Sequence, residues 1–330
     1  MIVQLAVDAM GTRFELVLYG QDAPLLRAAG EEAIDAILEE HHRLSIFAAA
    51  SHISRINAQA ASQPVGMDAD LFALLSLAER VWQESAGAFD PAVSGLMQKW
   101  GHRGEQDAHP TGLHEAEGER SGTAVGFAGV VLDHKAGTIA FTQPGDGGGG
   151  GNGGDGGTGG VGLDLGGIAK GYALDRAAAI LREAGGDAGL LHGGTSSIVA
   201  IGSPPGAHGW RIKLGCPAMA NAPAALMLRD MAASVSAPDG RVSDTGAGHI
   251  IDPRTGRPAT AARAAVTCGT SCTLADAWAT ALVVLGDRPG RMPTAIGSAV
   301  LTTAGGWTVC PTMTPIFENL AQGLTTEHDR

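Results

Sequence analysis

The stretch Val161-Gly-Leu-Asp-Leu-Gly-Gly-Ile-Ala-Lys-Gly171 sets the interpretation of this chain. It predicts a short strand, a turn at Gly166-Gly167 and a helix over Ile168–Ala184 that is closed by Gly185. Free main-chain amides at the start of a helix attract anions, and Lys170, one of only four lysines, stands beside them. Two interpretations stay open on these residues alone: a phosphate-binding turn, or a tightly packed turn whose Lys170 side chain points into solvent.

Patterns on both sides of this stretch predict an α+β fold. Apolar residues at helical spacing predict three more helices, and alternating apolar residues predict strands. Strands and helices come in clusters, which favours mixed or antiparallel sheets with flanking helices over a doubly wound sheet. The predicted helices are 23–42, 68–85 and 273–285. The predicted strands lie within 5–19, 130–142, 161–165, 190–191, 198–201 and 210–214, and in the sequence that follows the last helix up to Thr303.

Charge and hydropathy exclude two classes of protein. The formal net charge is −12, which is the wrong sign for sequence-independent binding to a nucleic-acid backbone. No apolar stretch approaches the about 18–20 uncharged residues of a membrane-spanning helix. The N-terminus has no basic region and reaches Asp8 before a long apolar block forms, unlike a secretory signal. We therefore expect a soluble, cytoplasmic protein with no nucleic-acid partner and no transmembrane segment.

Glycine dominates one segment of the chain. Twelve of the sixteen residues from Gly145 to Gly160 are glycine, which leaves the backbone too much freedom for a rigid element and predicts a flexible insertion over 145–160. The dinucleotide fingerprint Gly151-x-Gly153-x-x-Gly156 is nearly inevitable in such a composition, and two calcium β-roll frames beside it cannot bury a core. The polar residues 101–123 predict a separate, variable surface segment.

Four cysteines are too few for a disulfide framework. They are Cys216, Cys268, Cys272 and Cys310, and the spacing Cys268-x-x-x-Cys272 lacks the second pair of ligands that a zinc site needs. We expect reduced thiols in the core.

Asp276 and Thr280 stand four residues apart on the predicted helix 273–285 and therefore share one face. Both offer oxygen atoms, which are the ligands that a hard cation such as Mg²⁺ prefers. The segment Thr273-Leu-Ala-Asp276 is also a capping box, in which Asp276 would only bond back to the Thr273 amide. Taken alone, these residues favour the cap.

Two turn motifs carry further polar candidates. His249 comes shortly before the turn Asp252-Pro-Arg-Thr-Gly256, and Asp90 lies in Gly87-Ala-Phe-Asp-Pro91. A histidine at a strand edge is usually a hydrogen-bonded structural residue, and Asp90 fits the cap of a new element. Their local patterns therefore favour structural roles.

Taken together and in this order, the motifs resemble the ApbE family, the FAD:protein FMN transferases. The resemblance runs from residue 9 to about residue 303 and is specific because seven blocks keep one fixed order. Three positions depart from the family pattern: Gly167 replaces a common Ala, Thr195 a common acid or amide, and Ser236-Ala237 a common Ser-Gly pair. The blocks are Met10-Gly-Thr12, Ser45-Ile-Phe47 with Ile56-Asn57, Gly87–Pro91 with Trp100-Gly101, Asp164–Gly171 with Asp175, Gly193-Gly194, His249–Pro258, and Ala275–Leu282.

The resemblance implies a fold, a reaction and a set of site residues. It implies a single two-lobed domain over 1–330 with a variable tail over 304–330. It implies a Mg²⁺-dependent enzyme that cleaves FAD, attaches FMN through a phosphoester bond to a threonine or serine hydroxyl of a target flavoprotein, and releases AMP. By motif, Mg²⁺ would be bound by the Gly167 main-chain oxygen, Asp276 and the Thr280 hydroxyl, and FAD by Met10, Phe47, Ala88, Phe89, Asp90, Asp164, Lys170 and His249.

Three of these residues gain catalytic roles from the chemistry of the implied reaction. Cleaving a pyrophosphate builds charge on the departing AMP oxygens, which Mg²⁺ held by Asp276, with Lys170 nearby, would stabilise. His249 is the candidate base for the attacking hydroxyl, since an imidazole with an ordinary pKa of about 6.5 suits proton transfer at neutral pH. Two alternatives use the same pocket: an FAD pyrophosphatase in which water replaces the hydroxyl, and a non-catalytic FAD-binding protein.

Overall fold

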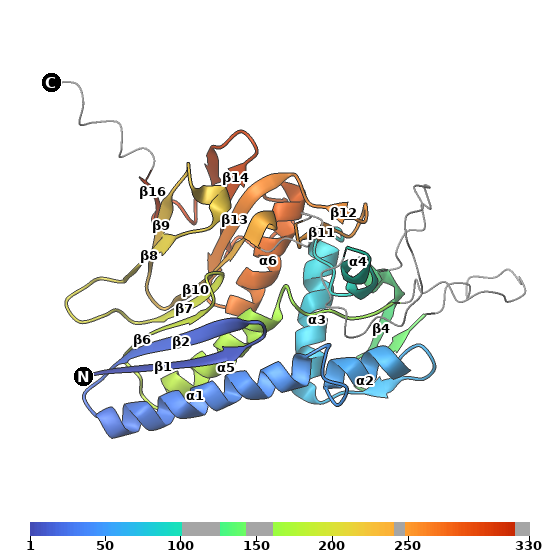
Figure 1. The fold of residues 1–330 in the computed structure, drawn as a ribbon, viewed down its shortest axis with the longest axis horizontal. Coiled ribbons are helices and arrows are strands. Elements are labelled where there is room, and N and C mark those ends of the chain that lie inside the picture. The colour runs from blue at the N-terminus through green and yellow to red at the C-terminus, as the bar shows by residue number, and fades with distance from the viewer. Residues whose placement is uncertain (101–125, 143–160, 241–247, 321–330) are drawn as a thin grey trace, which may run out of the picture.

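Figure 1 shows the fold as a computed structural model, which describes residues 1–100, 126–142, 161–240 and 248–320. Three predicted features lie wholly or partly outside these residues, and they keep the status of predictions. They are the surface segment 101–123, the Gly-rich insertion 145–160 and the last ten residues of the tail 304–330.

An eight-stranded antiparallel sheet forms the centre of the fold. β7 (Ser197–Ile201) lies within it and is buried along its whole length. Successive residues of a strand face opposite sides, so Ile198 packs into one apolar cluster while Val199 packs into another on the opposite face. The strand order is β1 (Ile2–Ala9), β2 (Thr12–Tyr19), β6 (Ala188–Gly193), β7, β10 (Met231–Ser236), β13 (Ala262–Gly269), β14 (Gly297–Thr302) and β15 (Trp307–Val309).

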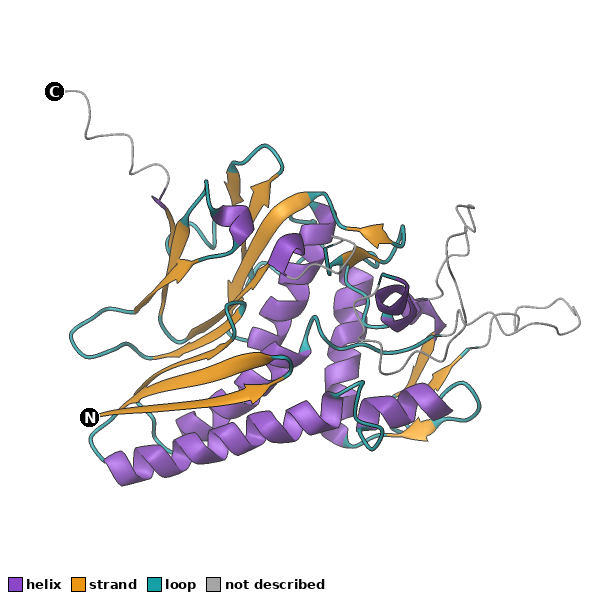
Figure 2. Ribbon diagram, viewed as in Figure 1, coloured by secondary structure: helices purple, strands orange, loops and turns teal. Residues whose placement is uncertain are grey.

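Three helices pack on one side of this sheet (Figure 2). α1 (Ala23–Leu44) packs against β1 and α5 (Ala169–Glu183), and α6 (Cys272–Leu285) packs against β10 and β13. Asp22 caps α1 by accepting the Leu25 amide. The predicted helices 23–42, 168–184 and 273–285 are confirmed. No helix in the described part of the chain combines the length and apolarity that crossing a bilayer requires.

A smaller group of elements packs against α6 on the side away from the sheet. Leu75, Ile139 and Trp278, all fully buried, belong to the apolar cluster that joins this group to α6. Asp68 accepts the Leu71 amide at the start of the predicted helix 68–85, which is confirmed. The group comprises α2 (His52–Gln59), α3 (Ala69–Glu84), α4 (Ser94–Lys99) and a sheet of β3 (Val65–Gly66), β5 (Thr138–Phe141) and β4 (Val130–Asp133).

The other face of the large sheet is covered by strands. Trp210 and Leu226 pack there into the same apolar cluster as Ile198. The helices and antiparallel sheets together confirm the α+β class, while the single two-lobed domain stays a prediction. The covering sheet consists of β16 (Phe317–Asn319), β9 (Ala224–Leu228) and β8 (Trp210–Leu214), and a short hairpin of β11 (Ile251–Asp252) and β12 (Arg257–Pro258) stands apart from it.

The predicted strand Val161–Leu165 is wrong. In this segment only Gly162 forms a β-bridge, a parallel one to Val93. The Asn57 side chain holds the segment instead, because it bonds both the amide and the carbonyl of Leu163 from 106 residues away. An alternating pattern cannot reveal such a distant partner. The sequence patterns did not predict ten of the elements, namely α2, α4, β3, β9, β10, β11, β12, β13, β15 and β16.

Two residues of α5 fix the start of α6. The Asp175 carboxylate accepts hydrogen bonds of 2.6–2.9 Å from the hydroxyls of Ser271 and Thr273 and from the amides of Cys272 and Thr273. One turn earlier, Gly171 lies so near that a Cβ there would collide with the Cys272 carbonyl group. The close contact at Gly171 and the hydrogen bonds of Asp175 therefore fix α5 against the start of α6.

We predict that Gly171→Ala destabilises the protein by at least about 1–3 kcal/mol, because the added methyl group meets backbone atoms that cannot rotate away. The control is Gly95→Ala in α4, where a Cβ would meet nothing within 4 Å. This control should keep or slightly raise the free energy of unfolding. Urea unfolding followed by circular dichroism measures both variants, and equal midpoints would contradict the prediction.

The four cysteines are free, as predicted, but only two of them are core residues. Cys268 and Cys272 are buried, whereas Cys216 and Cys310 are partly exposed. Partial burial alone would raise the pKa of Cys310, but hydrogen bonds from the Thr312 hydroxyl and the Ser298 amide lower it to about 7. Burial raises the pKa of Cys216.

Cys310 should therefore react fastest with iodoacetamide at about pH 7, because the thiolate is the nucleophile. The rate should fall as the pH drops below 7, and Cys310→Ser should remove the fast phase. Peptide mass spectrometry after a short exposure identifies the alkylated residue. A fast phase that survives Cys310→Ser would show the prediction to be wrong.

Candidate functional site

A cavity of about 570 Å³ lies where the large sheet, α5, α6 and the smaller group of elements meet. Its walls include every residue that the sequence analysis proposed for the site, although these residues span the chain from the first hairpin to the last helix. The cavity is therefore the place where the separate motifs come together. The proposed residues that line it are Met10, Phe47, Ala88, Phe89, Asp90, Asp164, Gly167, Lys170, His249, Asp276 and Thr280.

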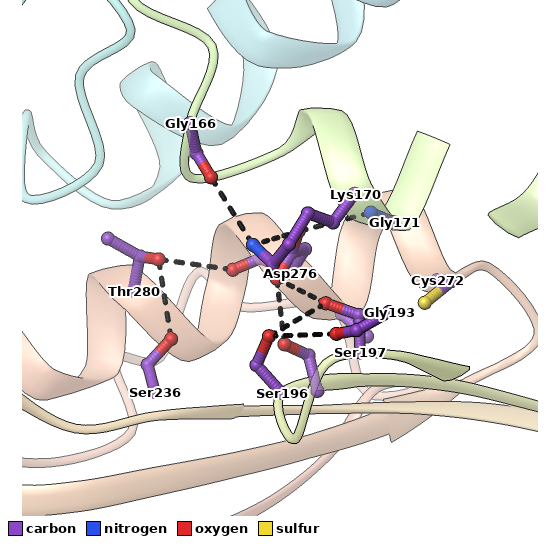
Figure 3. A network of polar contacts seen from close by, with 12 residues as sticks. Gly166, Lys170, Gly171, Gly193, Ser196, Ser197, Ser236, Cys272, Asp276 and Thr280 are labelled. Carbon is purple, nitrogen blue, oxygen red and sulfur yellow. Dashed lines mark hydrogen bonds and ion pairs between the residues drawn. The ribbon is translucent and has the colours of Figure 1, made fainter. Parts of the chain in front are cut away.

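Asp276 is the most deeply buried charged residue of the cavity, with 2% of its surface exposed. Its Oδ1 atom accepts hydrogen bonds from the Ser234 hydroxyl (2.8 Å) and the Ser197 hydroxyl (3.2 Å). Its Oδ2 atom accepts from the Gly171 amide (3.1 Å) and from Lys170 Nζ (3.3 Å), as Figure 3 shows. The carboxylate thus joins α6 to α5, β7 and β10.

The capping interpretation of Asp276 is wrong. Ser271 is the N-cap of α6 and accepts the Leu274 amide at 3.2 Å. Thr273 bonds to Asp175 of the neighbouring helix. A cap closer to the helix start and a partner on α5 thus leave Asp276 to face the cavity.

Lys170 points into the site and not into solvent, so that interpretation is also wrong. Its Nζ atom lies 3.3 Å from Asp276 Oδ2 and 3.4 Å from the Gly166 carbonyl oxygen (Figure 3), and 19% of its side chain is exposed. The neighbouring amides differ from expectation in another way. Those of Ile168 and Ala169 donate to the Leu165 carbonyl, and that of Gly171 donates to Asp276. The predicted cradle of free amides is thus largely used within the chain, and the ammonium group of Lys170 is the main attraction for an anion.

Gly167 and Thr280 complete one wall of the cavity beside Asp276. A Cβ on Gly167 would lie 3.4 Å from Thr280 Oγ1, so the main chain passes close to this hydroxyl. Thr280 Oγ1 also contacts the Asp276 carbonyl (3.3 Å) and Ser236 Oγ (3.4 Å). In the described ranges, no three His, Cys, Asp or Glu side chains gather as metal ligands. Any cation here would therefore be held by one carboxylate together with neutral oxygens, a donor set that fits Mg²⁺.

Asp90 and its neighbours form the apolar side of the cavity. Ala88 and Phe89 are buried, and the Asp90 carboxylate accepts the amides of Ala92 and Phe127 at 2.7–3.1 Å. Burial raises the pKa of Asp90, and these hydrogen bonds oppose the shift. Asp90 is not a helix cap, since α4 begins after Val93 without a side-chain cap. Its carboxylate instead fixes a turn and a distant segment.

The remaining predicted residues line the cavity and are partly or largely exposed. Phe47 is 66% exposed, and Met10 forms part of the turn between β1 and β2. Asp164 accepts the Gly166 amide at 2.9 Å and so shapes the turn before α5. His249 is partly exposed and lines the cavity just before β11.

Sequence reasoning missed the buried serines and one histidine. Ser197 and Ser234 are fully buried and both donate to Asp276. The spacing of Ser234 and Ser236 could have indicated one of these serines, because it puts two hydroxyls on one face of a strand. His41 also lines the cavity, from the last turn of α1, and no motif pointed to it.

Comparisons with known proteins identify the family of this chain. The family model described as the ApbE family matches residues 10–295. A protein named FAD:protein FMN transferase from Rhodobacter capsulatus is 31% identical over 84% of this chain, and this chain spans about half (50%) of that relative's length. A protein of the same name from Treponema pallidum is 30% identical, over 84% of this chain and 77% of the relative. The crystal structure of the ApbE protein from Thermotoga maritima has a TM-score of 0.79 at 25% identity and covers 96% of this chain and 99% of its own.

The fold and the cavity thus define an α+β protein of the class whose relatives are flavin-transferring enzymes. The chain belongs to the ApbE family. The family and the fold predicted from the sequence are confirmed, and the predicted enzyme class agrees with the names of these relatives.

We predict that Ser234→Ala lowers the free energy of unfolding by about 1–2 kcal/mol, because the buried Asp276 charge loses a short hydrogen bond. Ser196→Ala is the matched control, since its hydroxyl makes only contacts of 3.3–3.4 Å and its loss should cost about 0.5 kcal/mol or less. Denaturant unfolding compares the two. Equal losses for both variants would show that the Ser234 bond does not stabilise the fold.

Proposed function

We propose that this chain transfers FMN from FAD to a threonine or serine hydroxyl of a target flavoprotein, with Mg²⁺ as its metal and AMP as the leaving group. The observation that carries the proposal is the convergence of Gly167, Lys170, Asp276 and Thr280 on one cavity. The names of the curated relatives support the flavin transfer. The donor set supports the choice of metal.

Gly167, Asp276 and Thr280 would hold the Mg²⁺. This ion takes one or two carboxylates in proteins and completes its coordination with water and substrate phosphates. At this wall the cavity offers the buried Asp276 carboxylate, the Thr280 hydroxyl and the main chain of Gly167, which passes close to that hydroxyl. When bound, the metal would stabilise the charge that develops on the phosphate oxygens.

Lys170 would change partners when the site fills. A carboxylate has about four lone-pair positions, and Asp276 already receives four donors. The contact to Lys170 is the longest of the four, at 3.3 Å, and it comes from a flexible side chain. Its release would leave a lone pair of Asp276 for the cation and turn the ammonium group toward the FAD phosphates.

The acceptor hydroxyl would attack the phosphorus atom of the FMN half, in line with the departing AMP. One P–O bond forms to the acceptor, the P–O bond of the pyrophosphate breaks, and its electron pair leaves with AMP. His249 lines the same cavity and would accept the hydroxyl proton, since an imidazole is the side chain best matched to neutral pH.

The apolar residues would bind the flavin ring. Ala88 and Phe89 are buried in the cavity wall, while Phe47 presents most of its ring to solvent at the opening. An exposed aromatic side chain next to a cavity is suited to stacking against a planar ligand. The ring system would thus lie between a buried wall and an exposed aromatic side chain.

The test combines the protein with FAD, Mg²⁺ and a candidate flavoprotein. We expect covalent flavin fluorescence on the denatured target, AMP in equal amount, and loss of both with excess EDTA. Asp276→Asn and Thr280→Val should slow the transfer at least about 100-fold, because each removes metal-dependent charge stabilisation. Thr308→Val, at an exposed position on β15, is the control and should transfer at the normal rate.

Three outcomes separate the alternatives. Free FMN formed at full rate without any target would replace the transferase with an FAD pyrophosphatase. FAD that binds tightly and is recovered intact after long exposure to Mg²⁺ would indicate a binding protein. Transfer that persists at the normal rate in Asp276→Asn would refute the assigned metal site.

A further inference from the structure

His41 connects the end of the longest described helix to the first turn of the chain. The Met10 amide donates a hydrogen bond to His41 Nδ1 at 3.2 Å, across 31 residues of sequence. Both residues line the cavity. The bond therefore joins two walls of the cavity.

The backbone of this turn is strained. Ala9 and Thr12 pair directly, so the loop between β1 and β2 consists of Met10 and Gly11 alone. Both have positive φ values, +50° for Met10 and +69° for Gly11. Such turns favour Asn or Gly at these positions, and a methionine there is unfavourable. Strained residues persist where surrounding contacts hold them, commonly at functional sites.

The packing of the Met10 side chain explains why this turn has a methionine. The side chain is only partly buried, and it packs against two of the apolar clusters of the core. A more relaxed turn with Asn or Gly would lose this side chain. The unfavourable backbone conformation therefore places the Met10 side chain at the cavity. His41 Nδ1 on α1 holds the amide of the same residue.

His41 can accept this bond only while Nδ1 carries no proton. Burial, and to a smaller extent the neighbouring His42, lower the pKa of His41. The ring centroids of the two histidines are 5.1 Å apart. The titratable groups that face the same cavity from other segments are Asp90, Asp164, Lys170, Cys216, His249 and Asp276.

We propose that His41 is a positioning residue, which holds the Met10–Thr12 turn in the conformation that the flavin site requires. The inference rests on the proposed function, since it assigns the turn to FAD binding. His41 acts through Met10 and needs no contact with the reacting atoms. What matters is an acceptor at the place of Nδ1, and not the imidazole ring as such.

Two variants separate these possibilities. In His41→Asn the Oδ1 atom takes the place of Nδ1 on Cγ and keeps an acceptor, whereas His41→Leu has none. His42→Leu is the matched control, because His42 is the adjacent exposed histidine and does not line the cavity. Hydrogen exchange of the Met10 amide, measured without FAD, tests the bond. Titration with FAD, followed by flavin fluorescence, tests its consequence.

We expect the Met10 amide to exchange at least about tenfold faster in His41→Leu, and FAD to bind about tenfold more weakly, which corresponds to about 1.4 kcal/mol. His41→Asn should restore both to within about threefold of the wild type, and His42→Leu should change neither. Between about pH 7 and 5 the wild type should lose FAD affinity relative to His41→Asn, since only the imidazole gains a proton there.

Each measurement can overturn the inference separately. Unchanged exchange in His41→Leu would show that His41 does not hold the turn. Faster exchange with unchanged FAD affinity would show that the turn is not part of the flavin site. Failure of the wild type to bind FAD, with the exchange pattern as expected, would refute the proposed function and with it the flavin role of the turn, while the positioning of Met10 by His41 would stand.

Discussion

One buried negative charge organises the centre of this protein. An unpaired carboxylate at the depth of Asp276, which is 2% exposed, would cost several kcal/mol. The donors that match it come from three other elements: Lys170 and Gly171 on α5, Ser197 on β7 and Ser234 on β10. Because all of them must reach the same two oxygen atoms, the helices are fixed against the sheet at this point. The position of the cavity follows from that constraint.

The burial of α6, the helix that carries Asp276, requires small residues where neighbouring elements approach it. Eleven of the fourteen residues of α6 are buried, so the helix is enclosed on all sides between the sheet and α3. Its neighbour α5 can approach only because Gly171 has no side chain to collide with the Cys272 carbonyl group, and Asp175 then satisfies the first amides of α6. A rigid, enclosed helix places Asp276 and Thr280 more accurately than a surface loop could.

Local patterns predicted the long helices, but they missed inner strands such as β10 and β13, and they failed where the partner of a residue lies far along the chain. The helices at 23–42, 68–85, 168–184 and 273–285 were predictable because apolar spacing and caps are local properties. The segment Val161–Leu165 has the composition of a strand, yet Asn57 supplies its hydrogen bonds. Asp276 fits a capping box, yet its partners are two serines on separate strands. The motif order identified the family and hence the cavity residues, but it contained no sign of the contact between His41 and Met10.

The Asp276 carboxylate already accepts four hydrogen bonds, so a cation can bind to it only if one donor moves away. The ammonium group of Lys170 lies 3.3 Å from Asp276 Oδ2 and balances the charge of this buried carboxylate. In the proposed reaction a divalent cation takes over that task, and Lys170 is released toward a dianionic pyrophosphate that arrives at the same time. The charge at the core then stays matched in both states, because each cation that is added or moved faces an anion. Cation binding without FAD would instead separate Lys170 from its anionic partner Asp276 and supply no other anion, which opposes it. The arrangement therefore favours joint binding of metal and dinucleotide over binding of the metal alone.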